Sequence, residues 1–186
     1  MQQTYLHKAL IVKFIMLSLV LVIFLTLIPF VVKAQVIDDF SDGDFIVNPV
    51  WNGDVGEFDA SGGDLRLLSS GTNDSYLSTP STLVSQATWE FFVHLGFNPT
   101  SGNKAYVYIV SDQENLESDL NGYFVLIGNT DDEISLYRQD GATQTKIIDG
   151  TNDVIDASSV DVRIKVTRDD AGLWELFYDA TGGTSL

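Results

Sequence analysis

The stretch "VDVRIKVTR", residues 160–168, alternates apolar and polar side chains at every position but its last. The apolar residues are Val160, Val162, Ile164 and Val166, and the polar ones between them are Asp161, Arg163, Lys165 and Thr167. Successive side chains of a β-strand point to opposite faces. The pattern therefore predicts a strand with one buried face and one face in water.

The same alternation recurs in "ATWEFFVHLGF", residues 87–97. One face carries Trp89, Phe91, Val93, Leu95 and Phe97, and the other carries Glu90, Phe92 and His94. Two further runs, "KAYVYIV" (104–110) and "GYFVLIG" (122–128), are apolar on both faces, which predicts central strands that are covered on both sides or that carry a ligand face. No stretch after residue 34 shows the helical period.

Glycine-containing pairs separate these runs: Asn52-Gly53, Gly62-Gly63, Asn121-Gly122, Asp140-Gly141 and Gly182-Gly183. Such pairs favour tight turns between antiparallel strands. Short strands at regular spacing without helices predict an all-β fold, a two-sheet antiparallel β-sandwich. Trp89 and Trp174 are expected in its core.

The first 34 residues differ from the rest. Lys8 and Lys13 precede an apolar run from Phe14 to Val32, and Val32 and Ala34 occupy the positions that a signal peptidase reads. We predict a signal peptide over residues 1–34 and a single domain over 35–186. An uncleaved membrane anchor is the alternative, because the apolar run is long enough to span a bilayer. Both readings predict a secreted or cell-surface protein that meets the membrane only through this segment.

Residues 35–186 hold all 26 acidic residues and seven of the ten basic ones, which gives a formal charge of 7 − 26 = −19. This charge makes nucleic acid a poor partner, and we expect none, because phosphate binding needs clustered Lys and Arg. The chain has no cysteine, which excludes disulfides, thiol catalysis and cysteine-based metal sites. His94 is the one histidine after residue 34, which excludes a site with several histidines.

Several segments together carry a family resemblance: "DDFSDGDF" (38–45), "NPVWNGD" (48–54), "GYFVLIG" (122–128) and "VTRDDAGLWELFYD" (166–179). They resemble a concanavalin A-like (laminin G-like) jelly roll, as found at the amino terminus of large secreted bacterial surface proteins. The resemblance implies a carbohydrate-binding or adhesion domain followed by further domains of the same polypeptide. In that family a late strand closes the jelly roll, and we expect this sequence to lack its C-terminal closing strand or strands.

Four aspartates, Asp38, Asp39, Asp42 and Asp44, lie within seven residues. Calcium takes six to eight oxygen ligands, which makes Asp39, Asp42 and Asp44 a candidate calcium site. The spacing does not match an EF-hand loop. The alternative is that Asp38 and Asp39 flank a first strand and that Asp42 and Gly43 form a turn.

A second candidate site is a surface that binds sugar, since aromatic rings stack on sugar rings and carboxylates accept hydrogen bonds from hydroxyl groups. We expect six residues to share one sheet face: Glu90, Phe92, His94, Tyr106, Tyr108 and Tyr137. The alternative is that these aromatic residues pack under a loop or against a neighbouring domain.

A retaining glycosidase needs two carboxyl groups about 5–5.5 Å apart. The Glu-x-Asp-x-x-Glu strand of laminarinase-type jelly rolls is absent, and "ATWEFFVHL" offers Glu90 alone. The sequence thus predicts a non-catalytic module that binds a polysaccharide or a cell-surface glycan. A jelly-roll glycoside hydrolase or polysaccharide lyase is the first alternative, and a structural spacer domain is the second.

Overall fold

The computed structural model describes residues 36–69, 71, 74–183 and 186. They belong to one compact unit, Ala34–Leu186. The predicted signal peptide at 1–34 lies outside the described residues. No helix in the described part of the chain is long and apolar enough to cross a membrane.

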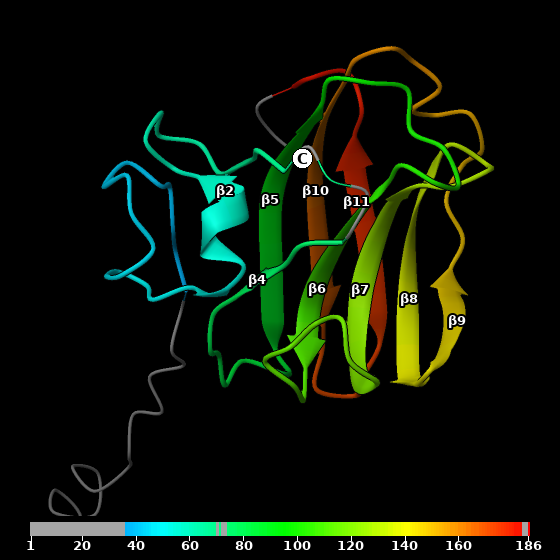
Figure 1. The fold of residues 1–186 in the computed structure, drawn as a ribbon. Helices are drawn as coiled ribbons and strands as arrows, with labels where there is room; N and C mark the ends of the chain where they lie inside the picture. The colour runs from blue at the N-terminus through cyan, green and yellow to red at the C-terminus, as the bar shows by residue number, and fades with distance from the viewer. Residues whose placement is uncertain (1–35, 70, 72–73, 184–185) are drawn as a thin grey trace, which may run out of the picture. The chain divides into compact units, whose positions relative to one another are not determined.

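The described residues form eleven strands and one short 3-10 helix (Figure 1). Four strands of two residues each and the helix come first: β1 (Asn52–Gly53), η1 (Val55–Glu57), β2 (Phe58–Asp59), β3 (Arg66–Leu67) and β4 (Leu77–Ser78). Seven longer strands follow: β5 (Ala87–Leu95), β6 (Ala105–Ser111), β7 (Leu120–Gly128), β8 (Glu133–Gly141), β9 (Thr143–Ile148), β10 (Val160–Arg168) and β11 (Trp174–Asp179).

The longer strands form two antiparallel sheets. The four-stranded sheet has the order β6-β7-β8-β9, and the three-stranded sheet has the order β11-β10-β5. In Figure 1 the four-stranded sheet lies in front of the three-stranded one. The prediction of an all-β fold with packed antiparallel sheets is therefore confirmed.

The core lies between these two sheets, and alternate residues of β10 form its centre. Val162, Ile164 and Val166 are each 0% exposed. Their β-branched side chains suit a pleated strand, and they pack in one cluster with Val125 and Leu136 of the four-stranded sheet. The burial pattern predicted for residues 160–168 is confirmed.

Aromatic side chains extend the core toward one edge of the three-stranded sheet. The Trp89 and Trp174 rings stack with their centroids 5.6 Å apart. Tyr123 of β7 reaches Trp174 from the opposite sheet, with centroids 4.6 Å apart. Both tryptophans thus pack against the core, as the sequence predicts.

Two expectations about strand order and turns are wrong. The run at 104–110 forms β6, which is an edge strand of its sheet, whereas β7 is a central strand. Asn121-Gly122 lies inside β7 instead of in a turn, because Gly122 lets β7 approach β6 closely: a Cβ there would stand 2.3 Å from the Val110 carbonyl oxygen. Residues 112–119 connect β6 to β7. The turn into β8 uses Asn129 and Asp132, which adopt positive φ angles of 99° and 46°.

We expect Ile164→Ala to lower the free energy of unfolding by about 2–5 kcal/mol, because it removes buried methyl groups and leaves a cavity between the sheets. Ile147→Ala is the matched control, since Ile147 lies on β9 and is 38% exposed; its effect should stay below about 1 kcal/mol. Urea denaturation followed by tryptophan fluorescence measures both. Equal effects of the two substitutions would contradict the assignment of the core.

Candidate functional site

The structure divides the six predicted sugar-binding residues between the two sheets. Glu90, Phe92 and His94 lie on β5 of the three-stranded sheet, whereas Tyr106 and Tyr108 on β6 and Tyr137 on β8 belong to the four-stranded one. The expectation that all six share one sheet face is therefore wrong. Alternation along a strand determines the face of each side chain, but it does not determine which strands pair, and β5 pairs with β10.

The three tyrosines surround one buried phenylalanine. Tyr108 of β6 and Tyr137 of β8 lie directly opposite Phe124 of β7 in the strand register. Ring centroids lie 5.2 Å from Phe124 for Tyr106, 5.1 Å for Tyr108 and 5.2 Å for Tyr137. We call these four residues the aromatic face.

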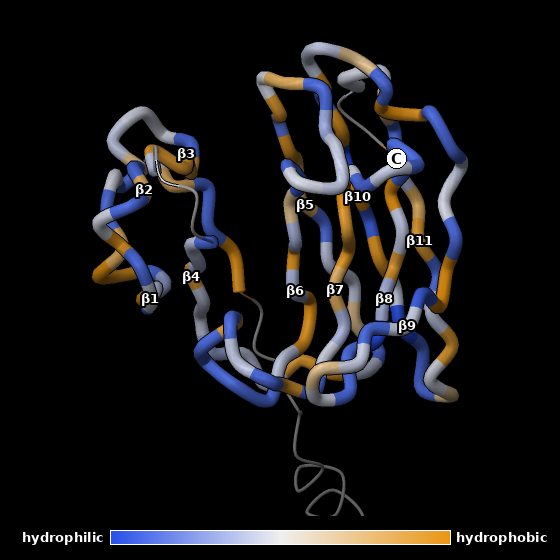
Figure 2. The backbone as a smooth tube through the Cα atoms, turned by 45° about the vertical axis from the view of Figure 1, so that its right-hand side comes forward, coloured by the Kyte–Doolittle hydropathy of each residue, from blue (hydrophilic) through white to orange (hydrophobic). Residues whose placement is uncertain are grey.

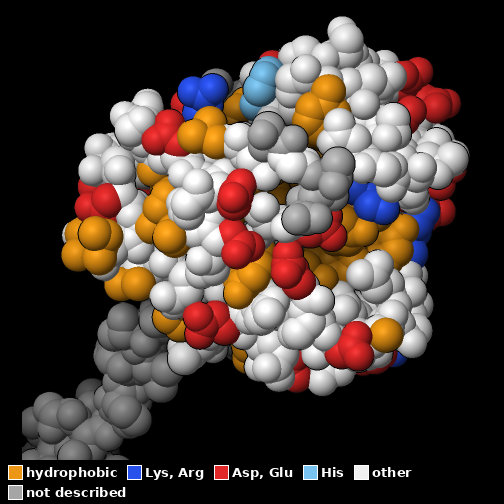
Figure 3. All heavy atoms as spheres, viewed as in Figure 1, with side chains coloured by type: hydrophobic (Ala, Val, Ile, Leu, Met, Phe, Trp, Pro, Cys, Tyr) orange, Lys and Arg blue, Asp and Glu red, His pale blue; other side chains and the backbone are white. Residues whose placement is uncertain are grey.

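The aromatic face points away from the core, because the residues that alternate with it, such as Val107, Val125 and Leu136, pack between the sheets. Phe124 is 0% exposed, Tyr106 is 41% exposed, and Tyr108 and Tyr137 are intermediate. In Figure 3 hydrophobic side chains, a colour class that includes tyrosine, are visible on the side of the four-stranded sheet, with acidic and basic side chains near them.

The N-terminal strands stand on this outer side of the sheet. In Figure 1 the segment with β4 crosses in front of β6, and in Figure 2, after rotation, it stands clear to the left of β6. β4 thus lies forward of the face that carries the aromatic residues.

Amide side chains lie at one end of the aromatic face. The Tyr108 hydroxyl donates a hydrogen bond of 2.6 Å to Gln139 Oε1, and Gln139 Nε2 donates one of 2.9 Å to the Gly141 carbonyl oxygen. Gln144 Nε2 also donates to Gln139 Oε1, at 3.4 Å. Burial raises the pKa of Tyr108 to about 12, because it disfavours the charged phenolate. Lys104 Nζ lies 5.6 Å from the Tyr106 ring centroid.

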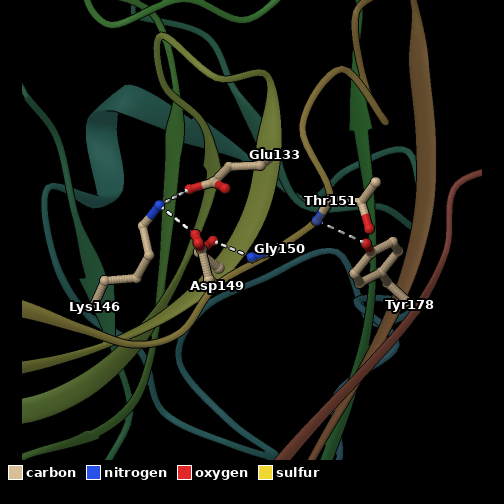
Figure 4. A network of polar contacts seen from close by, with 7 residues as sticks. Glu133, Lys146, Asp149, Gly150, Thr151 and Tyr178 are labelled. Carbon is tan, nitrogen blue, oxygen red and sulfur yellow. Dashed lines mark hydrogen bonds and ion pairs between the residues drawn. The ribbon is translucent and has the colours of Figure 1, made fainter.

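A charged network centres on Lys146, the residue opposite Tyr137 in the β8–β9 register. Figure 4 shows this network. Lys146 Nζ donates hydrogen bonds to Glu133 Oε1 at 2.5 Å and to Asp149 Oδ1 at 2.6 Å. These bonds raise the pKa of Lys146 and lower the pKa of Asp149. The Glu133 side chain is only 1% exposed, and its Oε2 has no hydrogen-bond partner among the described residues.

The loop after β9 ties the network to both sheets (Figure 4). Gly150 N donates to Ser135 Oγ of β8 at 2.9 Å, and Thr151 N donates to the Tyr178 hydroxyl of β11 at 3.2 Å. Position 150 requires glycine, because a Cβ there would stand 2.3 Å from the Ile134 carbonyl oxygen. The loop therefore has a fixed path beside Glu133 and Tyr137.

On β5 the other predicted residues pair with side chains of β10. Glu90 forms an ion pair with Arg163 at 3.4 Å, and His94 Nδ1 lies 2.8 Å from Asp161 Oδ1. Phe92 is 50% exposed, and the Arg163 guanidinium lies 6.0 Å from its ring centroid. This is a ladder of cross-strand pairs on a solvent face.

The opening aspartates form local turns. Asp39 Oδ1 accepts a hydrogen bond from Ser41 N at 3.1 Å, and Asp42 Oδ1 accepts one from Asp44 N at 3.5 Å. Residues 36–51 contain no strand, so the expected first strand beside Asp38 and Asp39 is wrong. In the described residues no group of three or more His, Asp or Glu side chains is arranged to hold a metal ion. Calcium binding by Asp39, Asp42 and Asp44 stays a prediction.

No protein-family model, curated protein or solved structure matches this chain. The concanavalin A-like resemblance therefore remains a hypothesis.

Four residues at or beside the aromatic face were not predicted from the sequence: Phe124, Glu133, Gln139 and Lys146. Phe124 stood in a run that was apolar on both faces, and this was the one available signal. Glu133 and Lys146 are 13 residues apart and meet through the pairing of β8 with β9.

We expect Lys146→Met to lower the free energy of unfolding by about 3–5 kcal/mol near neutral pH, because it leaves the buried Glu133 carboxylate without its counter-charge. Glu133→Gln combined with Lys146→Met should recover much of that loss, since the charge is then absent. Urea denaturation measures each variant. A double variant no more stable than Lys146→Met alone would contradict this role of the ion pair.

The stabilisation from Asp149 should depend on pH. Because its folded-state pKa is lowered, its contribution is present above the unfolded carboxyl value of about 3.9 and is lost as the pH falls through the folded value. The difference in stability between the native protein and Lys146→Met should therefore shrink on acidification from pH ~6 to pH ~3. A stability difference that grows on acidification would contradict this stabilising role of Asp149.

Proposed function

We propose that this domain is a non-catalytic carbohydrate-binding module and that the aromatic face of the four-stranded sheet is its contact surface. The observation that carries the proposal is the arrangement of three tyrosines around the fully buried Phe124, on the side of the sheet turned away from the core.

The aromatic face has the chemistry that a sugar requires. The C–H faces of a pyranose ring are apolar and stack on aromatic rings, while Gln144 and Lys104 supply hydrogen-bonding groups nearby. Phe124 lies between the tyrosine rings on the same face and contacts all three, so they lose little conformational freedom on binding. The net negative charge of residues 35–186 favours a neutral glycan over an acidic one.

The positions of Glu133 and Glu90 favour binding without hydrolysis. Glu133, on the strand that carries Tyr137, is 1% exposed and is bound by Lys146, so a substrate cannot reach it. Glu90 lies on the other sheet, where it pairs with Arg163. A retaining glycosidase needs two accessible carboxyl groups across one sugar. An exported module that binds a polysaccharide or a cell-surface glycan fits these features and the leader predicted at 1–34.

A polysaccharide array with purified protein tests the proposal. We expect binding without release of reducing sugar. Tyr106→Ala should weaken it about 3–10-fold, which corresponds to the roughly 0.5–1.5 kcal/mol of an aromatic contact. Phe92→Ala is the matched control, because Phe92 is 50% exposed on the other sheet, and it should leave the affinity unchanged.

The other outcomes identify the alternatives. Loss of affinity on Phe92→Ala but not on Tyr106→Ala would place the site on the three-stranded sheet and contradict the proposal. Release of reducing sugar that is abolished by Glu90→Gln would support a glycoside hydrolase. If the protein binds no polysaccharide on the array, the result would contradict the proposal and favour a structural spacer domain.

A further inference from the structure

A loop near the amino end of the domain displays three aliphatic side chains to solvent. Ile46 is 72% exposed, the largest value for any large hydrophobic residue among the described ones, and Val47 and Val50 are 50% and 48% exposed. We call residues 46–50 the aliphatic loop. Large apolar side chains gathered at a surface mark interaction sites more often than scattered single ones do.

The aliphatic loop is held in shape by hydrogen bonds at its base. Trp51 N donates to the Phe45 carbonyl oxygen at 2.9 Å, which closes the loop. Asp44 Oδ1 accepts hydrogen bonds from Ile46 N at 2.8 Å and from Val47 N at 3.3 Å. The base therefore fixes the backbone from which the exposed side chains project.

Trp51 secures the loop to the preceding segment. Its Nε1 donates to Asp38 Oδ2 at 2.6 Å, and its ring lies 5.7 Å from the Phe40 ring between centroids. A loop that is pre-ordered in this way loses little conformational entropy when a partner binds.

The segment that carries the aliphatic loop is strongly acidic. Residues 36–68 contain eight acidic residues and one basic residue, Arg66. Among the described residues, none of these acidic side chains forms a salt bridge, and six of them accept hydrogen bonds from backbone N–H groups: Asp38, Asp39, Asp42, Asp44, Asp54 and Asp59. Their charges remain available to an external cationic partner.

We propose that the aliphatic loop is a docking site for a polypeptide whose surface presents apolar side chains ringed by Lys and Arg. Charge complementarity selects this occupant, because the loop supplies the apolar contact and the carboxylates of residues 36–68, with Asp38 and Asp44 at the base of the loop, attract the basic rim. A second copy of the chain carries the same negative charge, and an anionic lipid surface is repelled as well.

The test uses the full chain and synthetic probes of equal length: a Leu/Lys amphipathic peptide, a Leu/Glu peptide and a Ser/Lys peptide. Fluorescence anisotropy of the labelled peptides measures affinity. We expect the Leu/Lys peptide to bind most tightly, with affinity that falls as salt is added. The triple variant Ile46→Ser, Val47→Ser, Val50→Ser should weaken it about tenfold or more.

Matched variants separate the apolar contribution from the charge. Val84→Ser, Ile147→Ser and Leu173→Ser together remove three exposed aliphatic residues elsewhere and should leave the affinity unchanged. Asp39→Asn, Asp42→Asn and Asp64→Asn together should weaken binding and flatten its salt dependence. Near-ultraviolet circular dichroism and array binding of each variant check that the sandwich is intact.

Four results would overturn the proposal. They are equal binding of the Leu/Lys and Ser/Lys peptides, equal binding of the Leu/Lys and Leu/Glu peptides, the same effect of both aliphatic triple variants, and no binding of the Leu/Lys peptide. Loop-dependent binding to phosphatidylcholine vesicles, or loop-dependent dimerisation in sedimentation, would assign the loop to a membrane or to a second copy instead.

Discussion

Burial of alternate side chains between two antiparallel sheets determines which residues of the long strands face the core and which face outward. Val162 and Ile164 of β10 and Val125 and Leu136 of the opposite sheet are fully buried. Because the side-chain period of a strand is two, a slip of one residue would exchange the core and solvent faces of an entire strand. The same constraint turns Tyr106, Tyr108 and Tyr137 outward, since Val107 and Leu136 must face inward.

Packing of the core also holds the aromatic face on the outer side of the sheet in place. Phe124 adjoins a core residue, Val125, on a central strand, and its ring contacts the three tyrosine rings beside it. The loop after β9 adds a second restraint, because it hydrogen-bonds to Ser135 on one sheet and to Tyr178 on the other. Rings and polar groups fixed before a ligand arrives bind at a lower entropic cost than mobile ones.

Local pattern predicted the strands and their faces, because periodicity is a property of one strand at a time. It predicted the buried set of β10 and the inward position of Trp89. It could not predict pairing: Glu90 and Tyr106 lie on neighbouring strands in sequence but on different sheets. The contact of Glu133 with Lys146 likewise depends on the β8–β9 register, and Asn121-Gly122 resembled a turn although a close approach of β6 and β7 requires its glycine.

Nuclear magnetic resonance tests most directly whether the outer face of the four-stranded sheet contacts a glycan. The protein, labelled with nitrogen-15 and carbon-13, is titrated with a soluble oligosaccharide of whichever polysaccharide the array identifies. We expect shift changes centred on the rings of Tyr106 and Tyr137 and the side-chain amide of Gln144. Changes centred on Glu90, Phe92 and His94 would contradict it.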